Sequence, residues 1–297
     1  MSVHFVFVTD SHHYPEAPQD YGAPKMLTRS HQIMSAAIPQ INALQPQFVV
    51  HGGDLLCGGG SFDLPFSTYC RSIAETAAVF GQLEAPVHYI PGNHDCDAQE
   101  GSFAELARHF PIPQLLDIVP VAPRLRLALA NVYLQSPLDH PQGHWTSQHD
   151  RALRQAADQA QEEKCALLLV IHPWVLPTYE PAPGGFVGNA AGLLETIVQC
   201  PAIAAVFTGH RHTNRIRVHR DFLVVDTACL VGYPLGFRQI WLGQDGYFKT
   251  RFQSLDLPAL RQESFDRSTA QANQVWAGEV HDRDSEILIP RLQALWA

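Results

Sequence analysis

Five short apolar segments, each followed at once by polar side chains, constrain the fold of this chain more than any other feature. The first, Val3–Val8, is rich in β-branched and aromatic residues and ends where the polar residues Thr9 and Asp10 begin. Segments of this composition that end in this way are typical of β-strands. The other four end at side chains that can bind metal ions, and they cover residues 47–50, 86–90, 165–171 and 202–207.

Amphipathic stretches lie between these strands and predict helices. They cover residues 25–44, 68–83, 102–109, 147–164 and 190–199. The alternation predicts a parallel or mixed sheet covered by helices, with functional loops at the carboxyl ends of the strands. Short strand-like segments then follow without helices and indicate hairpins or a second sheet, at 215–219, 222–226, 238–242 and 247–252. The sequence thus favours an α/β fold with a two-layer sandwich of sheets.

Composition excludes several classes of protein. Among 297 residues the longest apolar run, 165–171, is far shorter than the roughly 20 residues of a membrane span. A net charge of -9 repels polyanions, so no nucleic acid is expected as a partner. The first residues show no basic stretch before an apolar one, and the chain is therefore predicted to be cytoplasmic. Six cysteines never occur as Cys-x-x-Cys, which argues against a zinc knuckle.

Metal-binding side chains follow all five strands. Asp10 and His12 are separated by one residue, so in an extended segment both point the same way. Asp54 follows two glycines, where a tight turn would direct its carboxylate to the same crevice. Each feature alone is common in structural loops. Together, the sequence predicts seven ligand-type side chains on one sheet edge: Asp10, His12, Asp54, Asn93, His172, His210 and His212.

The tetrapeptide at residues 92–95, Gly-Asn-His-Asp, is the sharpest of these motifs. Asn93 supplies a neutral oxygen ligand, and His94 supplies an imidazole that either supports the ligands or acts in catalysis. The carboxylate of Asp95 lies next to His94 in the chain and is expected to orient the ring of that histidine.

These five blocks, in this order and over roughly residues 3–226, resemble the motifs of the calcineurin-like metallophosphoesterase superfamily. The resemblance implies a four-layer α/β/β/α sandwich of two mixed sheets flanked by helices. It implies one metal ion bound by Asp10, His12, Asp54 and His212. It implies a second metal ion bound by Asp54, Asn93, His172 and His210, with Asp54 as the bridge. His94 resembles the family's non-ligand histidine, which contacts the phosphate and can protonate the leaving group.

The implied cofactor is a pair of divalent or mixed-valence metal ions. Nitrogen and oxygen ligands suit Mn, Fe, Zn or Co and do not select among them. Two metals about 3.5–4 Å apart can hold a bridging hydroxide and stabilise both the attacking and the leaving oxygen of a phosphate ester. The resemblance therefore implies a metal-dependent phosphoric ester hydrolase.

Departures from subfamily patterns narrow the substrate class. Asp54 is followed by Leu55 rather than by the Asp-Arg of protein phosphatases, and Cys57 stands where purple acid phosphatases carry a tyrosine. The motif pattern is most similar to class III cyclic-nucleotide phosphodiesterases, which favours hydrolysis of small phosphodiesters, cyclic nucleotides among them. The alternatives are a phosphomonoesterase, a lipid-linked pyrophosphatase, or a non-catalytic metal-binding scaffold.

Further residues near the motifs are candidates for substrate contact. Asn93, His94 and His13 are predicted to bind substrate, and Tyr14 and Tyr21 lie in the same loop as His13. Residues 173–188 carry three aromatic side chains, and they either line the pocket or pack as a surface loop.

Two other side chains near the ligands have expected roles of their own. Arg211 is expected to point away from the metals and to form a surface salt bridge. A disulfide between Cys57 and Cys96 is conceivable.

The division of the chain follows from the extent of the motifs. Residues 1–254 are interpreted as the metallophosphoesterase catalytic domain, and residues 255–297 as a C-terminal extension that ends in a helix. Within residues 285–297, apolar side chains recur at helical spacing: Leu288, Leu292, Leu295 and Trp296. This helix either docks on its own domain or forms a contact in a homo-oligomer.

Overall fold

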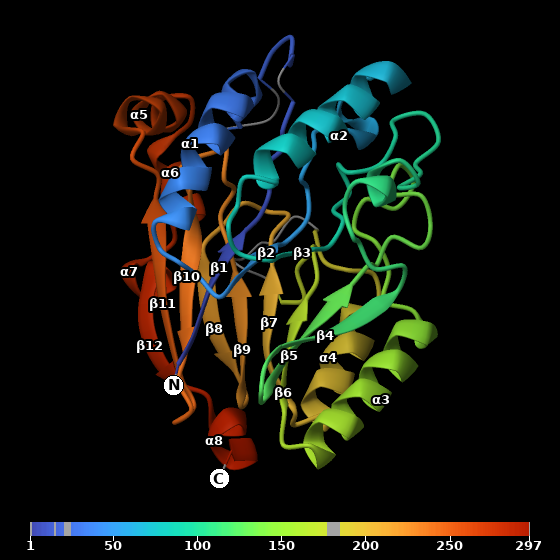
Figure 1. The fold of residues 1–297 in the computed structure, drawn as a ribbon, viewed down its shortest axis with the longest axis vertical. Coiled ribbons are helices and arrows are strands. Elements are labelled where there is room, and N and C mark those ends of the chain that lie inside the picture. The colour runs from blue at the N-terminus through green and yellow to red at the C-terminus, as the bar shows by residue number, and fades with distance from the viewer. Residues whose placement is uncertain (1, 15, 21–24, 177–184, 297) are drawn as a thin grey trace.

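Two mixed sheets of six strands form the centre of the computed structural model, which describes residues 2–14, 16–20, 25–176 and 185–296 (Figure 1). In the first sheet, β1, β2 and β3 are parallel, and β10, β11 and β12 extend the sheet in antiparallel fashion. In spatial order its strands are β12 (Asp284–Leu288), β11 (Tyr247–Ser254), β10 (Gly236–Leu242), β1 (Val3–Val8), β2 (Phe48–His51) and β3 (Val87–Tyr89).

The second sheet has four parallel strands in its middle, β5, β6, β7 and β9. Antiparallel strands close its two edges. In spatial order its strands are β4 (Leu116–Ala122), β5 (Leu125–Ala130), β6 (Ala166–Val170), β7 (Ile203–Thr208), β9 (Phe222–Asp226) and β8 (Arg215–His219). The strand-like segments predicted after residue 214 form two hairpins, one in each sheet. The β8–β9 hairpin belongs to this sheet, and the β10–β11 hairpin belongs to the first.

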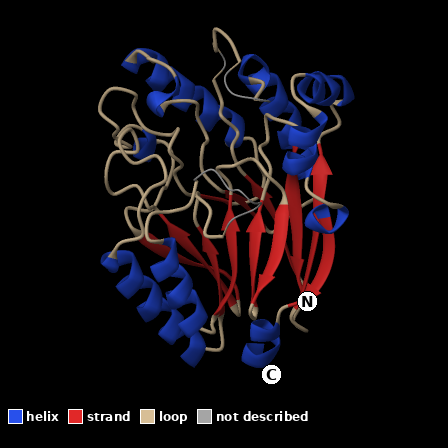
Figure 2. Ribbon diagram, turned by 180° about the vertical axis from the view of Figure 1, so that it is seen from behind, coloured by secondary structure: helices blue, strands red, loops and turns tan. Residues whose placement is uncertain are grey.

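Helices lie on the outer side of each sheet and cover part of the first one (Figures 1 and 2). Helices α1 (Ser30–Asn42) and α2 (Phe66–Phe80) pack on the first sheet. Helices α3 (Ser147–Glu162) and α4 (Ala190–Gln199) pack on the second. The inner faces of the two sheets pack against each other in a separate apolar cluster. This order confirms the predicted four-layer α/β/β/α sandwich.

Strand β1 shows how the sequence builds these layers. Phe5 and Phe7 pack in the cluster between the sheets, whereas Val6 and Val8 pack beneath α1 and α2. Successive side chains of a strand point to opposite faces, so a strand buried on both faces needs apolar residues throughout. All four side chains are at most 1% exposed. The unbroken apolar sequence of Val3–Val8 is therefore explained by the position of β1 inside the first sheet, where both faces are buried.

Residues 97–130 differ from the sequence prediction. The helix predicted at 102–109 is wrong, because only a single 3₁₀ turn forms there, Leu106–Arg108. The backbone N–H of Asp97 donates to Ser102 O, and that of Gly101 donates to Asp97 O, so the start of the segment closes a loop instead. The β4–β5 hairpin that follows has no counterpart in the prediction.

The C-terminal residues complete the first sheet. Strand β12 pairs with β11, so residues 285–288 are strand rather than helix, and the terminal helix α8 covers only Pro290–Trp296. Leu292 and Leu295 are buried in the cluster between the sheets, as a helix docked on its own domain requires. Three short helices precede β12: α5 (Pro258–Asp266), α6 (Ala270–Ala277) and α7 (Val280–Arg283).

Two further predictions concern this part of the chain. A domain boundary after residue 254 and a homo-oligomer contact through the last segment both stay predictions.

Among the described residues, no helix has the length and apolar character that crossing a membrane requires.

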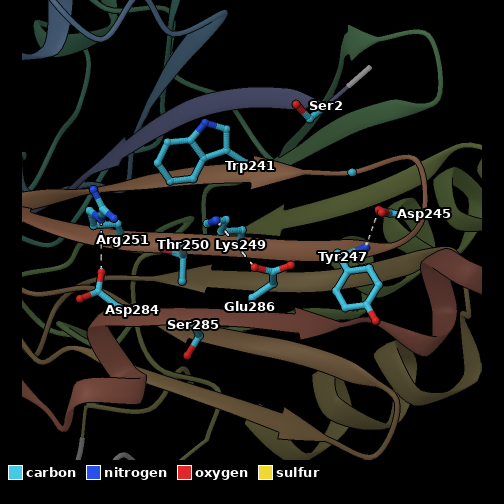
Figure 3. A pocket seen from close by; sticks show the side chains of 11 residues that line it. Ser2, Trp241, Asp245, Tyr247, Lys249, Thr250, Arg251, Asp284, Ser285 and Glu286 are labelled. Carbon is cyan, nitrogen blue, oxygen red and sulfur yellow. Dashed lines mark hydrogen bonds and ion pairs between the residues drawn. The ribbon is translucent and has the colours of Figure 1, made fainter.

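The outward face of β10, β11 and β12 is exposed and bears a shallow hollow of about 680 Å³ (Figure 3). Trp241 lines it together with two exposed ion pairs, Lys249 with Glu286 and Arg251 with Asp284. None of the ligand-type side chains predicted from sequence lies among the described lining residues. The size of a hollow therefore does not mark the functional site in this molecule.

Candidate metal centre

The loops that follow five strands meet at one side of the sandwich. Strands β1, β2 and β3 are parallel to one another, as are β6 and β7, so their carboxyl ends point the same way (Figure 1). The loops that follow them bring together, in chain order, Asp10, His12, Asp54, Asn93, His172, His210 and His212.

The first group of metal-binding atoms comes from Asp10, His12, Asp54 and His212. Nε2 of His212 lies 3.1 Å from Oδ1 of Asp10 and 3.2 Å from Nε2 of His12. Nε2 of His12 lies 3.7 Å from Asp10 Oδ1 and 3.8 Å from Asp54 Oδ2. Asp10, His12 and Asp54 are almost completely buried. Four potential ligand atoms therefore surround one small volume.

The second group shares Asp54 with the first. One metal-binding atom from each of Asp54, His172 and His210 lies within 4.8 Å of the other two. Nε2 of His172 is 3.2 Å from Asp54 Oδ2, and Nδ1 of His210 is 3.0 Å from Oδ1 of Asn93. Asp54 thus stands between two groups of nitrogen and oxygen atoms, which is the position a bridging carboxylate takes in a two-metal site.

The state of the imidazole rings fits metal ions at these positions. Nδ1 of His172 donates to the carbonyl oxygen of Gly52 over 2.7 Å, so Nε2 is the nitrogen that faces Asp54 and would bind an ion once its proton is lost. This buried Nε2 has no hydrogen-bond partner, although it lies close to the carboxylate of Asp54. A cation between the two atoms would satisfy both. The assignment of each ligand to one of two metals stays a prediction.

The backbone is strained where these side chains are presented. Non-glycine residues rarely adopt positive φ, and those that do cluster at functional sites. Five of the ten described non-glycine residues with positive φ are predicted ligands: Asp10, His12, Asp54, His210 and His212. Gly92 permits a close approach, because a Cβ there would lie 2.2 Å from Asp54 Oδ1. The backbone conformation of these loops therefore directs the predicted ligand side chains toward one another.

The charges of the centre favour a cation. Burial acts to raise the pKa of Asp10, but His212 holds it well below its ordinary value, and His172 does the same for Asp54. Burial acts to lower the pKa of His172, yet Asp54 raises it to about 9. Burial lowers the pKa of His210 to about 3. Two carboxylates beside one imidazolium leave net negative charge, which divalent cations would neutralise.

His94 lies beside the metal-binding atoms and is held by a residue that the sequence analysis did not single out. Its ring centre is 5.0 Å from that of His12. Its Nδ1 is 2.6 Å from Oγ of Ser61 and 3.4 Å from the carbonyl oxygen of Gly58. These contacts fix the ring through Nδ1 and leave Nε2 for another partner.

The expectation that Asp95 orients His94 is wrong. The carboxylate of Asp95 accepts the backbone N–H groups of Leu56 and Gly92 instead, over 2.8 and 2.7 Å. Burial and the neighbouring charge of Asp54 raise the pKa of Asp95 to about 8. Asp95 therefore ties two ligand-bearing loops together.

His13 is corrected as a substrate-binding residue. Its ring is fully buried, with Nδ1 2.6 Å from Oγ1 of Thr76 and Nε2 3.1 Å from Nδ1 of His31. His13 therefore faces α1 and α2, which carry His31 and Thr76, rather than the pocket. Tyr14 is also buried, in a small apolar cluster, and Tyr21 lies outside the described residues.

A pocket of about 360 Å³ opens on the metal centre. His94, His210 and His212 line it together with four residues not predicted to contact the site: Lys25, Arg211, Thr213 and Trp276. Arg211 was expected at the surface, but its guanidinium carbon lies 5.7 Å from the ring centre of Trp174 and its side chain borders this pocket. Trp174, in the loop at 173–188, approaches the site through its contact with Arg211. Residues 177–184 of this loop lie outside the described residues.

All six cysteines are free thiols, so the conceivable disulfide between Cys57 and Cys96 does not form. Cys57 and Cys229 nevertheless lie close to the metal-binding atoms, each within 4.8 Å of a nitrogen of His12. Burial raises the pKa of the Cys57 thiol to about 12 and that of Cys229 well above its ordinary value.

The fold is shared with solved structures. A dimetal phosphatase from Danio rerio is similar with a TM-score of 0.69 at 14% identity, over 85% of this chain and 96% of that one. The anchor in the inner membrane complex of Plasmodium is similar with a TM-score of 0.53 at 13% identity, over 86% and 85%. No curated protein matches the sequence. At these identities the likeness shows the fold alone.

The family follows from the sequence. The sequence model of calcineurin-like phosphoesterases matches residues 3–214, which include every strand-end residue of the metal centre. The fold and the paired ligand groups agree with this match. This chain belongs to the calcineurin-like phosphoesterase family, whose members hydrolyse phosphoric esters with a dinuclear metal site.

Proposed function

We propose that this protein is a phosphodiesterase that hydrolyses small phosphodiesters, cyclic nucleotides among them, with two bound metal ions. The observation that carries the proposal is the position of Asp54 between two groups of ligand atoms, with His94 beside them at the same pocket. When bound, the metals would supply an activated water and Lewis acidity toward the phosphoryl oxygens.

The residues of the chain have separate tasks in this proposal. Asp10, His12, Asp54 and His212 would hold one metal, and Asn93, His172 and His210 would hold the second together with Asp54. His94 faces the substrate through Nε2, because Ser61 and Gly58 occupy Nδ1, and its imidazolium form would donate a proton to the leaving oxygen. Asn93 also contacts the substrate phosphate.

The surroundings of the site favour a small anionic substrate. The pocket of about 360 Å³ lies in the range of roughly 300–1,000 Å³ for small-molecule sites. Lys25 and Arg211 line it, so the local charge attracts phosphate although the whole chain carries a net charge of -9. The acidic surface disfavours a polymeric nucleic acid.

A phosphomonoesterase is the second candidate, because the Danio rerio structure of the same fold is described as a dimetal phosphatase. A lipid-linked pyrophosphatase would use the same metal centre. A non-catalytic scaffold is the remaining alternative, and the anchor protein from Plasmodium has the same fold. The presence of every predicted ligand and of His94 favours an enzyme.

The decisive experiment compares two model esters. Protein stripped by a chelator and reloaded in parallel with Mn²⁺, Fe²⁺, Co²⁺, Zn²⁺ or Mg²⁺ is assayed with bis(p-nitrophenyl) phosphate and p-nitrophenyl phosphate. We expect metal-restored activity with a preference for the diester. A preference for the monoester would replace the proposal with the phosphatase, and metal binding without turnover of either ester would favour the scaffold.

The role of His94 has its own test. His94→Ala is expected to keep both metals and to lower kcat about 10²–10⁴-fold, the range for loss of a general acid. The exposed His109, which pairs with Glu105, supplies the control variant His109→Ala, expected to match the wild type. Wild-type kcat in His94→Ala would reject the assigned role.

Two properties of the protein in its cell also belong to the proposal. The six free thiols are consistent with a reducing compartment, and we place the enzyme in the cytoplasm. A homo-oligomer that uses the C-terminal segment would have to use residues other than the buried Leu292 and Leu295.

A further inference from the structure

Trp276 borders the metal pocket although it comes from a distant part of the chain. It lies in α6, beyond residues 3–214 that the family model matches. It is partly exposed and lines the same pocket as His94, His210 and His212. An indole beside a phosphoesterase centre offers a flat apolar face to the organic part of a substrate.

The backbone of α6 is tied directly to the loop that carries the last two ligands. The N–H of Asn214 donates to the carbonyl oxygen of Trp276 over 3.0 Å. Gly278, with φ +68°, allows the two segments to touch, because a Cβ there would lie 2.3 Å from Asn214 O. Asn214 follows His212 by two residues, so the indole and the ligand loop are positioned together.

A buried arginine reinforces this link. Arg238 in β10 is fully buried and donates to Oδ1 of Asn214 over 2.9 Å and to the carbonyl oxygen of Asp282 over 3.0 Å. The carboxylate of Asp282, in α7, accepts the backbone N–H of Ile216 over 2.9 Å. Buried polar groups satisfied in this way give one rigid arrangement. The place of Trp276 is therefore built into the fold.

Two cations lie in the same pocket. Lys25 is 7% exposed and close enough to His12 and His94 to lower their pKa values, after burial as the larger cause for both rings. Arg211 stacks near Trp174, which holds its long side chain at the pocket. In the proposed function, bound metals and His94 would take up the single charge of the phosphodiester that is cleaved. Lys25 and Arg211 line the same pocket and would add positive charge toward a second anionic group.

We infer that Lys25, Arg211 and Trp276 form a recognition subsite for substrates that carry an aromatic ring and an anionic group besides the scissile phosphate. The ring packs against Trp276, and the second anion binds Lys25 and Arg211. This inference rests on the proposed function and narrows its substrate class. In this subsite, substrate specificity is determined by Trp276, Lys25 and Arg211. Hydrolysis itself takes place at the metal centre.

Three non-hydrolysable phosphonates separate the two features. Methylphosphonate, phenylphosphonate and 4-carboxyphenylphosphonate are titrated by calorimetry into the Mn²⁺-loaded protein. We expect phenylphosphonate to bind about tenfold more tightly than methylphosphonate, the scale of one aromatic contact. The carboxylate should tighten binding further by about threefold or more, as a charge-assisted contact does.

Variants assign each gain to its residue. Trp276→Ala should abolish the preference for the ring, and Trp276→Phe should retain most of it. Lys25→Met and Arg211→Met should each remove the gain from the carboxylate while leaving the ring preference, and Lys25→Arg should restore the gain. The control Trp241→Ala, on the outward face of the first sheet (Figure 3), should bind all three ligands as the wild type does.

The outcomes distinguish this inference from the proposed function. A ring preference that persists in Trp276→Ala, or no ring preference in the wild type, overturns the subsite. A carboxylate gain that persists in both Met variants overturns the anion site. Hydrolysis of bis(p-nitrophenyl) phosphate is measured on the same preparations. Absent hydrolysis with the expected phosphonate pattern would reject the proposed function and leave the subsite in place.

Discussion

Residues 3–214 and residues 215–296 contribute to this molecule in different ways. The first region contains every predicted metal ligand, each placed directly after a parallel strand. The second contains none of them, yet it supplies β8 to β12, four helices and Trp276 at the wall of the pocket. The contrast teaches that the metal centre is encoded by local motifs, whereas the walls around it depend on contacts between distant segments.

One buried polar group from each region shows a further difference. In the first region, the buried Nε2 of His172 has no hydrogen-bond partner and faces the carboxylate of Asp54. In the second, the buried Arg238 donates to several acceptors, among them Asn214 and Asp282. We therefore expect substitutions at the metal centre to affect metal binding, and substitution of Arg238 to affect stability. The four predictions below test this division, from the largest expected effect to the smallest.

Asp54→Asn should abolish the metal centre and leave the fold. The variant loses the charge that both ligand groups share, so turnover should fall at least about a hundredfold, as on removal of a charge-stabilising group. Elemental analysis should show loss of bound metal, and circular dichroism should match the wild type. Asp117→Asn, at an exposed position of β4, is the control. Full metal content and activity in Asp54→Asn would contradict the shared-ligand position.

Arg238→Met should destabilise the protein without removing a ligand. The change leaves buried acceptors at Asn214 and Asp282 without their donor, and a loss of about 1–3 kcal/mol in the free energy of unfolding is expected for each. Urea denaturation measures it. Arg251→Met, at an exposed ion pair with Asp284, is the matched control. Equal stability of the two variants would show that the second region is not held by this network.

Ser61→Ala should lower kcat about tenfold while KM and metal content stay unchanged. The hydroxyl of Ser61 holds Nδ1 of His94, and partners of this kind are worth about 10–100-fold. Ser61→Thr, which keeps the hydroxyl, should recover most of the rate. A rise in KM alone would mean that Ser61 contacts substrate instead of positioning His94.

Lys249→Met should change almost nothing. Lys249 and Glu286 form an ion pair of 3.7 Å on the exposed face of the first sheet (Figure 3), and both side chains are 59% exposed. Such pairs contribute about 0–1 kcal/mol to stability. Thermal unfolding and hydrolysis of bis(p-nitrophenyl) phosphate should both match the wild type. A large loss of activity would make this hollow functional and overturn its exclusion from the site.

The sequence by itself determined the parts that depend on local pattern. Apolar segments such as Val3–Val8 predict central strands because both faces of the strand are buried, and β1 confirms this. The order of the strand-end motifs indicated the family and, through it, the four-layer fold. The convergence of the seven ligand-type side chains followed because parallel strands end at the same edge of a sheet.

Only the tertiary structure decided which side chains surround those ligands. Spacing along the chain placed Asp95 beside His94, but a contact across the fold gives that place to Ser61. His13, Lys25 and Trp276 were misplaced or unnoticed for the same reason. A short-range pattern reports the periodicity of one segment, whereas the neighbour of a side chain is set by which remote segments pack against it. Nothing in the local sequence carries that information.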